Sequence, residues 1–198
     1  MAAPVTMFGV GGTETLSSEQ VTLRDGTVVT LVPMAPADAE RLVRFHAGLS
    51  PETVYRRFFS FHPELSHNEL YRFTHVDHRD REAMVASNGA EIVAVARFDR
   101  GSDPAVAEVA FVVADPWQGR GLGSLLFRRL AERARSVGVR RFVADTLPEN
   151  SRMLAVFHHA GVPVTSSHAD GVVHLELLLD AYDPPQDTGR RLTREGAR

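Results

Sequence analysis

A Gly-rich segment carries the clearest chemical signal in this sequence. The run QGRGLG at residues 118–123 follows an apolar stretch and leads into a segment with helical spacing of leucines. Glycines let a backbone come close to a ligand, and the first amide groups of a helix have no carbonyl partner inside it. With the positive end of the helix dipole, such amides favour an anion such as a pyrophosphate. The run lacks the Gly-Lys-Ser/Thr of a Walker loop, and its GxGxG spacing differs from the dinucleotide GxGxxG.

The same run resembles the acetyl-CoA loop of the GNAT N-acetyltransferases, Gln/Arg-x-x-Gly-x-Gly/Ala. Asn150, with Gly161 eleven residues later, resembles the asparagine and helix that lie beside the pantetheine arm in that family. The predicted element order also matches the GNAT fold from about residue 27 to residue 179. Within the superfamily, segments 23–59, 107–115 and 141–161 resemble the Pat-type protein-lysine acetyltransferases of bacteria.

This resemblance implies a set of residues that bind acetyl-CoA. The backbone of the strand end before the loop would pair with pantetheine like an added strand, and the loop amides would hold the pyrophosphate. The expected contacts are Val112, Val113, Ala114, Gln118, Gly119, Arg120, Gly121, Leu122, Gly123, Ser124, Asn150 and Phe157. No metal ligands are expected, because the spacing of the histidines matches no zinc pattern.

Glu108 is the candidate catalytic base. A lysine amine has a pKa of about 10.4 and must lose a proton before it can attack a thioester. Glu108 interrupts an apolar strand, so we expect burial to raise its pKa toward the working range. The resemblance agrees, because Pat-type and histone-type members place a glutamate at this point. The alternative is an outward-facing or salt-bridged glutamate on a half-exposed strand.

The general acid of many GNAT enzymes is missing here. Those enzymes have a tyrosine four residues before the glycine that ends the helix, whereas this sequence has Phe157. A phenyl ring cannot donate a proton, which departs from the broad family pattern but matches the Pat-like one. A thiol pKa of about 8.5 makes the CoA thiolate a tolerable leaving group without such a donor.

Periodicity and turn signals predict the elements that position these residues. A hairpin around the Asp25–Gly26 turn is followed by three helices, the first with Leu42, Val43, Phe45, His46 and Leu49 on its buried side. The order continues with three strands, a helix, a strand, a helix and two strands, which predicts an α/β GNAT fold with a mixed, mostly antiparallel sheet. We expect one domain over residues 19–182 between flexible tails at 1–18 and 183–198.

Composition narrows the function further. The 198 residues include no cysteine, which excludes disulfides and thiolate metal sites, and no lysine, since all 22 basic residues are arginine. The net charge of −3 gives no global attraction to nucleic acid or membranes, although residues 120–141 hold seven arginines and one acid. Lacking a signal-like start or a long apolar run, the chain is expected in the cytoplasm.

The sequence therefore predicts an N-acetyltransferase that uses acetyl-CoA as co-substrate. A protein lysine is the favoured acceptor, and a small amine or an aminoglycoside is the alternative. A catalytically silent CoA-binding domain and a nucleic-acid-binding protein using the arginine-rich helix are the competing classes. The expected partners are acetyl-CoA and the acceptor, without nucleic acid or membrane, in a monomer or homodimer.

Overall fold

The computed structural model describes residues 18–181, so nearly all of both predicted tails and Tyr182 lie outside the described residues. An eight-stranded sheet has the strand order β1-β2-β3-β4-β5-β6-β8-β7. Its strands are β1 (Glu19–Thr22), β2 (Val28–Pro33), β3 (Arg81–Asn88), β4 (Glu91–Arg100), β5 (Val106–Val113), β6 (Arg141–Thr146), β7 (Val164–Ala169) and β8 (Val172–Leu178). The pairing is antiparallel everywhere except between β5 and β6. The predicted mixed, mostly antiparallel sheet is confirmed.

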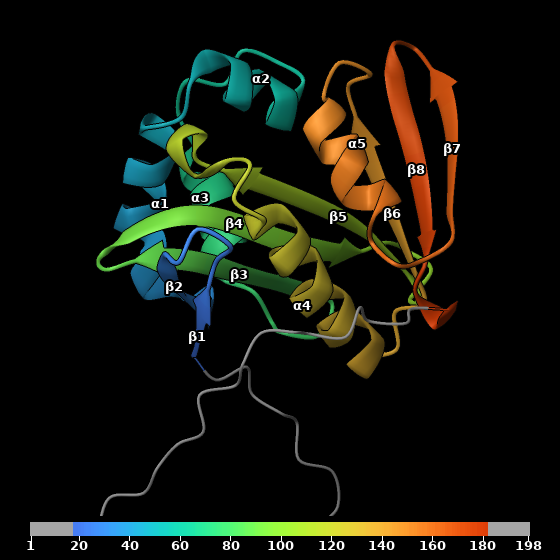
Figure 1. Ribbon diagram of the computed structural model, residues 1–198, viewed down its shortest axis with the longest axis horizontal. Coiled ribbons are helices and arrows are strands. Elements are labelled where there is room, and N and C mark those ends of the chain that lie inside the picture. The colour runs from blue at the N-terminus through green and yellow to red at the C-terminus, as the bar shows by residue number, and fades with distance from the viewer. Residues whose placement is uncertain (1–17, 182–198) are drawn as a thin grey trace, which may run out of the picture.

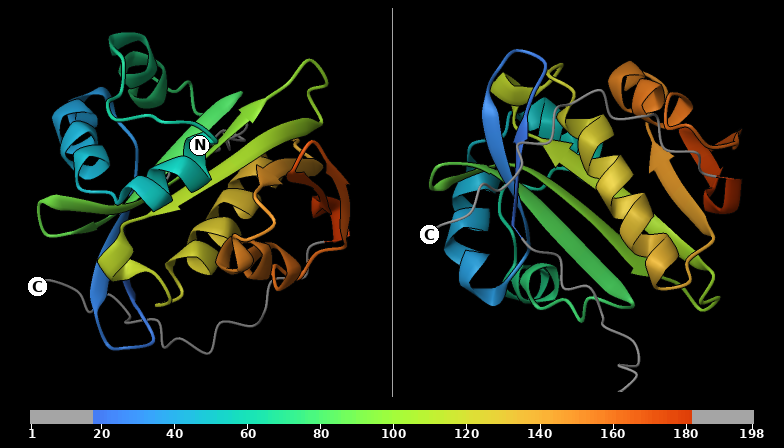
Figure 2. Two further views of the ribbon diagram at one scale, coloured as in Figure 1. Left: turned by 90° about the horizontal axis from the view of Figure 1, so that it is seen from above. Right: turned by 60° about the horizontal axis from the view of Figure 1, so that its bottom comes forward.

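Helices cover both faces of this sheet (Figure 1). They are α1 (Ala39–Ala47), α2 (Pro51–Phe58), α3 (His67–Thr74), α4 (Leu122–Ser136) and α5 (Ser151–His158). Seen from above, α1, α2 and α3 lie on one side of β3 to β5, and α4 and α5 lie on the other (Figure 2). Each side has its own apolar core, one around Phe98, Phe127 and Phe142 under α4, the other around Met34 and Phe45 under α1.

Local capping hydrogen bonds set the starts of two of the helices. The Ser50 side chain accepts a hydrogen bond from the Thr53 amide at 3.2 Å, with Pro51 as the first helical residue. Ser66 and Glu69 form a capping box, in which the Glu69 carboxylate accepts from the Ser66 amide at 2.9 Å. These caps satisfy amide groups that a helix leaves unpaired at its start.

The central strands β5 and β6 separate partway along the sheet. They pair over three residues, Val106 with Arg141, Ala107 with Phe142 and Glu108 with Val143. Beyond this point β5 continues along β4, while β6 stays paired with β8 along its whole length. One edge of β5 therefore has no strand partner after Glu108. This separation positions the candidate site.

One detail differs from the sequence prediction. Val43 is 45% exposed, because the buried stripe of α1 runs through Leu42, Phe45 and His46, and a neighbouring position is turned about 100° away. The first of the two strands that the sequence predicts after the last helix is β7. Nearly all of its residues are exposed, so it has none of the apolar alternation that marks a strand in sequence.

Candidate active site

A cavity of about 730 Å³ follows the separation of β5 from β6. Its walls are β5, the loop before α4, the end of β6, and residues of α2 and α5. Most of the residues predicted to bind a ligand line it, namely Glu108, Val112, Val113, Gln118, Gly119, Gly121, Leu122, Gly123, Ser124, Asn150 and Phe157. Ala114 and Arg120 are absent from this lining.

The strand edge of β5 presents alternate backbone groups to the cavity. The Ala114 amide donates to the Val93 carbonyl at 2.9 Å, which makes Ala114 and Val112 the residues whose backbone groups bond β4. Phe111 and Val113 alternate with these two residues, so their backbone groups point to the open edge. This corrects the expectation of three consecutive backbone partners, because successive residues of a strand face opposite edges.

The Gly-rich loop forms the turn into α4 that its sequence predicts. Gly119 has φ +77° and Gly121 has φ +90°, in the left-handed region that L side chains rarely adopt. Gly121 is the N-cap of α4, so the amides of the next residues lie at the positive end of the helix dipole. The loop geometry and the cavity fit a pyrophosphate bound to a pantetheine arm.

Gln118 fixes this loop to the strand and to two helices. Its side-chain amide donates to the Val113 carbonyl at 3.1 Å and to the Thr53 hydroxyl at 3.2 Å. Its carbonyl oxygen accepts from Arg152 at 2.6 Å. Gln118 thus occupies the Val113 carbonyl and leaves the Val113 amide for a ligand.

Arg120 points away from the cavity, which corrects its predicted contact. Its guanidinium pairs with Asp25 at 3.1 Å and lies 4.9 Å from the centre of the Trp117 ring. The β1–β2 hairpin is tied to the loop by this ion pair. Arg24, from the same hairpin, lines the cavity beside the loop and lies 4.0 Å from where a Gly121 Cβ would stand. No sequence pattern points to Arg24, because its approach to the loop depends on how the hairpin packs.

Glu108 lies where β5 and β6 separate, and it is exposed to the cavity. The expectation of burial is wrong, because the side chain points to the face where the sheet opens. Within residues 18–181 its carboxylate forms no ion pair, so the alternative of a salt-bridged glutamate fails, whereas that of an outward-facing glutamate agrees with the observed exposure. An unpaired carboxylate facing an open cavity is free to accept a proton.

The helix α2 is anchored to the end of β5 by Asp115. The Asp115 carboxylate accepts from the Ser50 amide at 3.0 Å, the Ser50 hydroxyl at 2.8 Å and the Thr53 hydroxyl at 2.8 Å. Burial alone would raise the pKa of Asp115, but these hydrogen bonds outweigh it and hold the pKa below its ordinary value. One side of the cavity is therefore held to the strand that carries Glu108.

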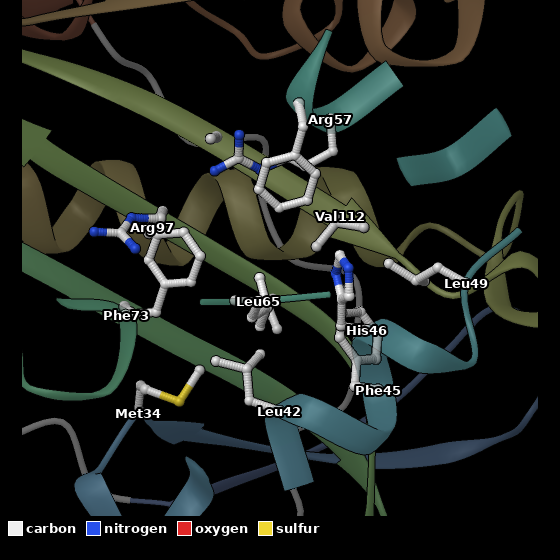
Figure 3. A pocket seen from close by; sticks show the side chains of 14 residues that line it. Met34, Leu42, Phe45, His46, Leu49, Arg57, Leu65, Phe73, Arg97 and Val112 are labelled. Atoms are coloured by element: carbon white, nitrogen blue, oxygen red, sulfur yellow. The ribbon is translucent and has the colours of Figure 1, made fainter. Parts of the chain in front are cut away.

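Two arginines that the sequence analysis did not single out lie on the same face of the sheet as Glu108. Arg97 is nearly buried on β4 and Arg57 reaches in from α2 (Figure 3). Arg97 donates to Asp99 through two nitrogens at 2.8 and 2.9 Å and lies 4.5 Å from the centre of the Phe73 ring. The sequence could have indicated Arg97, because an arginine inside the otherwise apolar strand 91–100 is unusual. Arg57 has no such mark, because it lies in an ordinary polar helix sequence.

Phe157 and Asn150 are held by α5. Phe157 is 2% exposed and packs against Phe111 and Phe127, with ring centres 6.0 and 6.2 Å apart. The Asn150 side chain caps α5 by accepting from the Met153 amide at 3.2 Å. Both residues border the cavity, Asn150 at its polar side and Phe157 at its apolar wall.

The arginine-rich segment 120–141 is mostly neutralised. Carboxylates pair with Arg120, Arg129, Arg133, Arg140 and Arg141. This pairing argues against a nucleic-acid surface. Among residues 18–181, no three His, Cys, Asp or Glu side chains are grouped to hold a metal ion. None of the helices in this range is long and apolar enough to cross a membrane.

A mixed sheet that opens beside a Gly-rich helix start is the architecture of the GNAT N-acetyltransferases. The chain matches the model of the acetyltransferase (GNAT) family over residues 50–162. This protein belongs to that family.

Two curated relatives and one solved structure agree. The chain is 39% identical over 171 residues to the acetyltransferase Pat of Mycolicibacterium smegmatis, covering 85% of this chain and 50% of that protein. It is 31% identical over 135 residues to an acetyltransferase of Pseudomonas aeruginosa, covering 66% of this chain and 73% of the other. The GNAT domain of S. lividans PAT superposes with a TM-score of 0.76 at 42% identity, covering 80% of this chain and 95% of that domain. The chain thus spans half the length of the first relative.

Proposed function

We propose that this chain transfers an acetyl group from acetyl-CoA to the side-chain amine of a protein lysine. One arrangement carries the proposal, namely Glu108 exposed to the cavity at the point where β5 leaves β6, in the same cavity as the open strand edge and the start of α4. The similarity to Pat supports a protein acceptor.

The residues of the cavity divide the task of binding the co-substrate. The amides at the start of α4 would hold the pyrophosphate, and the backbone groups of Phe111 together with the Val113 amide would pair with the pantetheine arm. The thioester would then lie along β5, beside the edge that begins after Glu108. The β5 amides that face this edge are suited to receive the oxyanion formed in the reaction.

Glu108 would act as the general base. The acceptor ammonium gives its proton to the Glu108 carboxylate, directly or through a water, and the neutral amine attacks the thioester carbonyl. The carbon–sulfur bond then breaks and the thiolate leaves, with the proton of the attacking nitrogen available to it. Phe157 supplies no proton and instead forms the apolar wall.

Incubation of the protein with isotopically labelled acetyl-CoA and a cell lysate tests the acceptor class. We expect mass spectrometry to find labelled protein lysines well above a reaction without enzyme. The chain has no lysine, so every labelled acetyl-lysine must come from a substrate. Label found in small amines alone would contradict a protein acceptor. Binding of acetyl-CoA without any labelled product would identify a silent binding domain.

A further inference from the structure

Arg57 stands at the boundary between two cavities. It lines the large cavity with Glu108 and also a smaller apolar pocket beneath α1, α2 and α3 (Figure 3). Its position is fixed because α2 is anchored through Ser50 and Thr53 to Asp115, and because the guanidinium lies 5.0 Å from the centre of the Phe58 ring. The cation is therefore held in place at the wall of the cavity that Glu108 also lines.

Arg57 has no carboxylate partner in the part of the chain that the structure describes. The nearby Arg97 does have such a partner, because its Nε and Nη2 both donate to the Asp99 carboxylate. Asp99 also forms an ion pair with Arg72 at 3.2 Å, so its carboxylate is already shared by two arginines. Glu108 acts on the charge of Arg57 from a distance, without an ion pair between them.

The surroundings make an unpaired charge at this position costly. Burial, followed by the charge of Arg97, lowers the pKa of Arg57 to about 10, and the charges of Glu108 and Asp99 oppose this only in part. The group stays protonated near neutral pH. Arg57 is half-buried, and a guanidinium that has lost part of its hydration without gaining a counter-charge would be stabilised by a bound anion.

We propose that Arg57 binds a carboxylate of the acceptor, close to the amine that is acetylated. Glu108 and Arg57 line the same cavity with opposite charges and no mutual ion pair, so the site matches an acceptor with an ammonium and a carboxylate side by side. For a protein acceptor, this is a lysine with an aspartate or glutamate next to it. The inference rests on the proposed acetyl transfer and names its substrate class.

A guanidinium suits this task because its planar donors match both oxygens of a carboxylate. A hydrogen bond to a charged group changes binding by about tenfold to a hundredfold. The Arg57→Lys variant would keep the positive charge but lose the paired planar donors, so it should show part of the preference for a carboxylate.

The experiment compares matched acceptors in steady-state assays of thiol release. One pair of lysine-centred peptides differs by Asp or Asn beside the lysine, and a second pair, glycine and glycinamide, covers small amines. The wild type should favour the carboxylate member by about tenfold or more in kcat/KM, through KM. Arg57→Gln should remove the preference, Arg57→Lys should restore part of it, and Arg57→Glu should favour a peptide with Arg beside the lysine.

Controls separate this role from folding and from the chemistry. Arg44→Gln, an exposed α1 arginine 3.6 Å from Glu91 and outside both cavities, should keep the preference. Each variant should keep its acetyl-CoA affinity by calorimetry.

The possible results are distinct. Equal kcat/KM for both members of each pair in the wild type would overturn the inference while acetyl transfer stands. A loss of kcat in Arg57→Gln that is the same for both members would place Arg57 at the thioester instead, and would also overturn it. Absence of turnover with every acceptor would overturn the proposed function itself.

Discussion

The carboxylates on the open face of the sheet differ in their freedom to accept a proton. Asp99 is opposite Glu108 in the β4–β5 register. Burial would raise the pKa of Asp99, but its bonds to Arg97 and Arg72 outweigh this and hold the pKa below its ordinary value. A carboxylate held in this way is a poor base at neutral pH. Glu108, which has no such partner, is the available one.

We predict that Glu108→Gln lowers kcat by about a hundredfold or more, because an amide cannot take the proton of the acceptor amine. Acetyl-CoA affinity, measured by calorimetry, should stay within about twofold, since the loop and strand edge are unchanged. Glu176→Gln is the matched control, an exposed strand glutamate that pairs with Arg141 at 3.2 Å. Unchanged turnover in Glu108→Gln would remove Glu108 from the mechanism.

At the scale of elements, α2 depends on one loop carboxylate. Asp115→Asn places an amide NH2 against one of the three groups that now donate to it. We expect a loss of about 1 kcal/mol in unfolding free energy and faster hydrogen exchange of the α2 amides. Glu64→Gln, on the exposed segment between α2 and α3, is the control. Equal exchange in both variants would contradict the anchoring role.

The pH dependence of this anchor follows from the lowered pKa of Asp115. A folded pKa below the unfolded value of about 3.9 adds stability above that pH, and the contribution is lost as the pH falls through the folded pKa. Protection of α2 should therefore decline below about pH 4. Asp115→Asn should lack this part of the decline.

The buried pair of Glu82 and Arg133 joins the sheet to α4. Glu82 is fully buried, and its carboxylate meets the Arg133 Nε at 3.0 Å and the His78 Nδ1 at 2.7 Å. Glu82→Gln leaves the guanidinium buried without its counter-charge, so we predict a loss of about 3–5 kcal/mol in urea unfolding. The double variant Glu82→Leu with Arg133→Met should recover much of this loss. A double variant no more stable than Glu82→Gln would show that the pair itself stabilises the fold.

At the scale of the whole molecule, the sheet has two parts that share an apolar core but pair over only a short stretch. The strands β1 to β5 and β6 to β8 share three residue pairs. A co-substrate bound in the separation would touch both parts, from β5 to α5. Its binding should therefore affect the stability of the entire fold.

We predict that acetyl-CoA at a hundred times its dissociation constant raises the unfolding free energy by about 2.7 kcal/mol, seen as a higher Tm. Hydrogen exchange in β6 and α5 should slow as well. Gly121→Glu should abolish both effects, because a negative side chain would enter the anion site. Gly138→Glu carries equal backbone strain, at φ +90°, beyond the far end of α4 and should keep them. A Tm that does not respond to acetyl-CoA would contradict the proposed binding site.

The sequence by itself determined the features that depend on neighbours along the chain. The glycine turn before α4, the caps at Ser50, Ser66 and Asn150, and the order of strands and helices follow from local hydrogen bonds and apolar periodicity. Most of the candidate site residues marked in the sequence line the cavity.

The tertiary structure alone decided which side chains and backbone groups of the site are free to contact a ligand. The exposure of Glu108 could not be foreseen from the sequence, because it depends on where β6 leaves β5. The alternation that directs Ala114 to β4, the turn of Arg120 toward Asp25 and the lone charge of Arg57 likewise come from segments distant in sequence. Local patterns fix the elements, whereas burial and pairing are set by the strands and helices that pack against them.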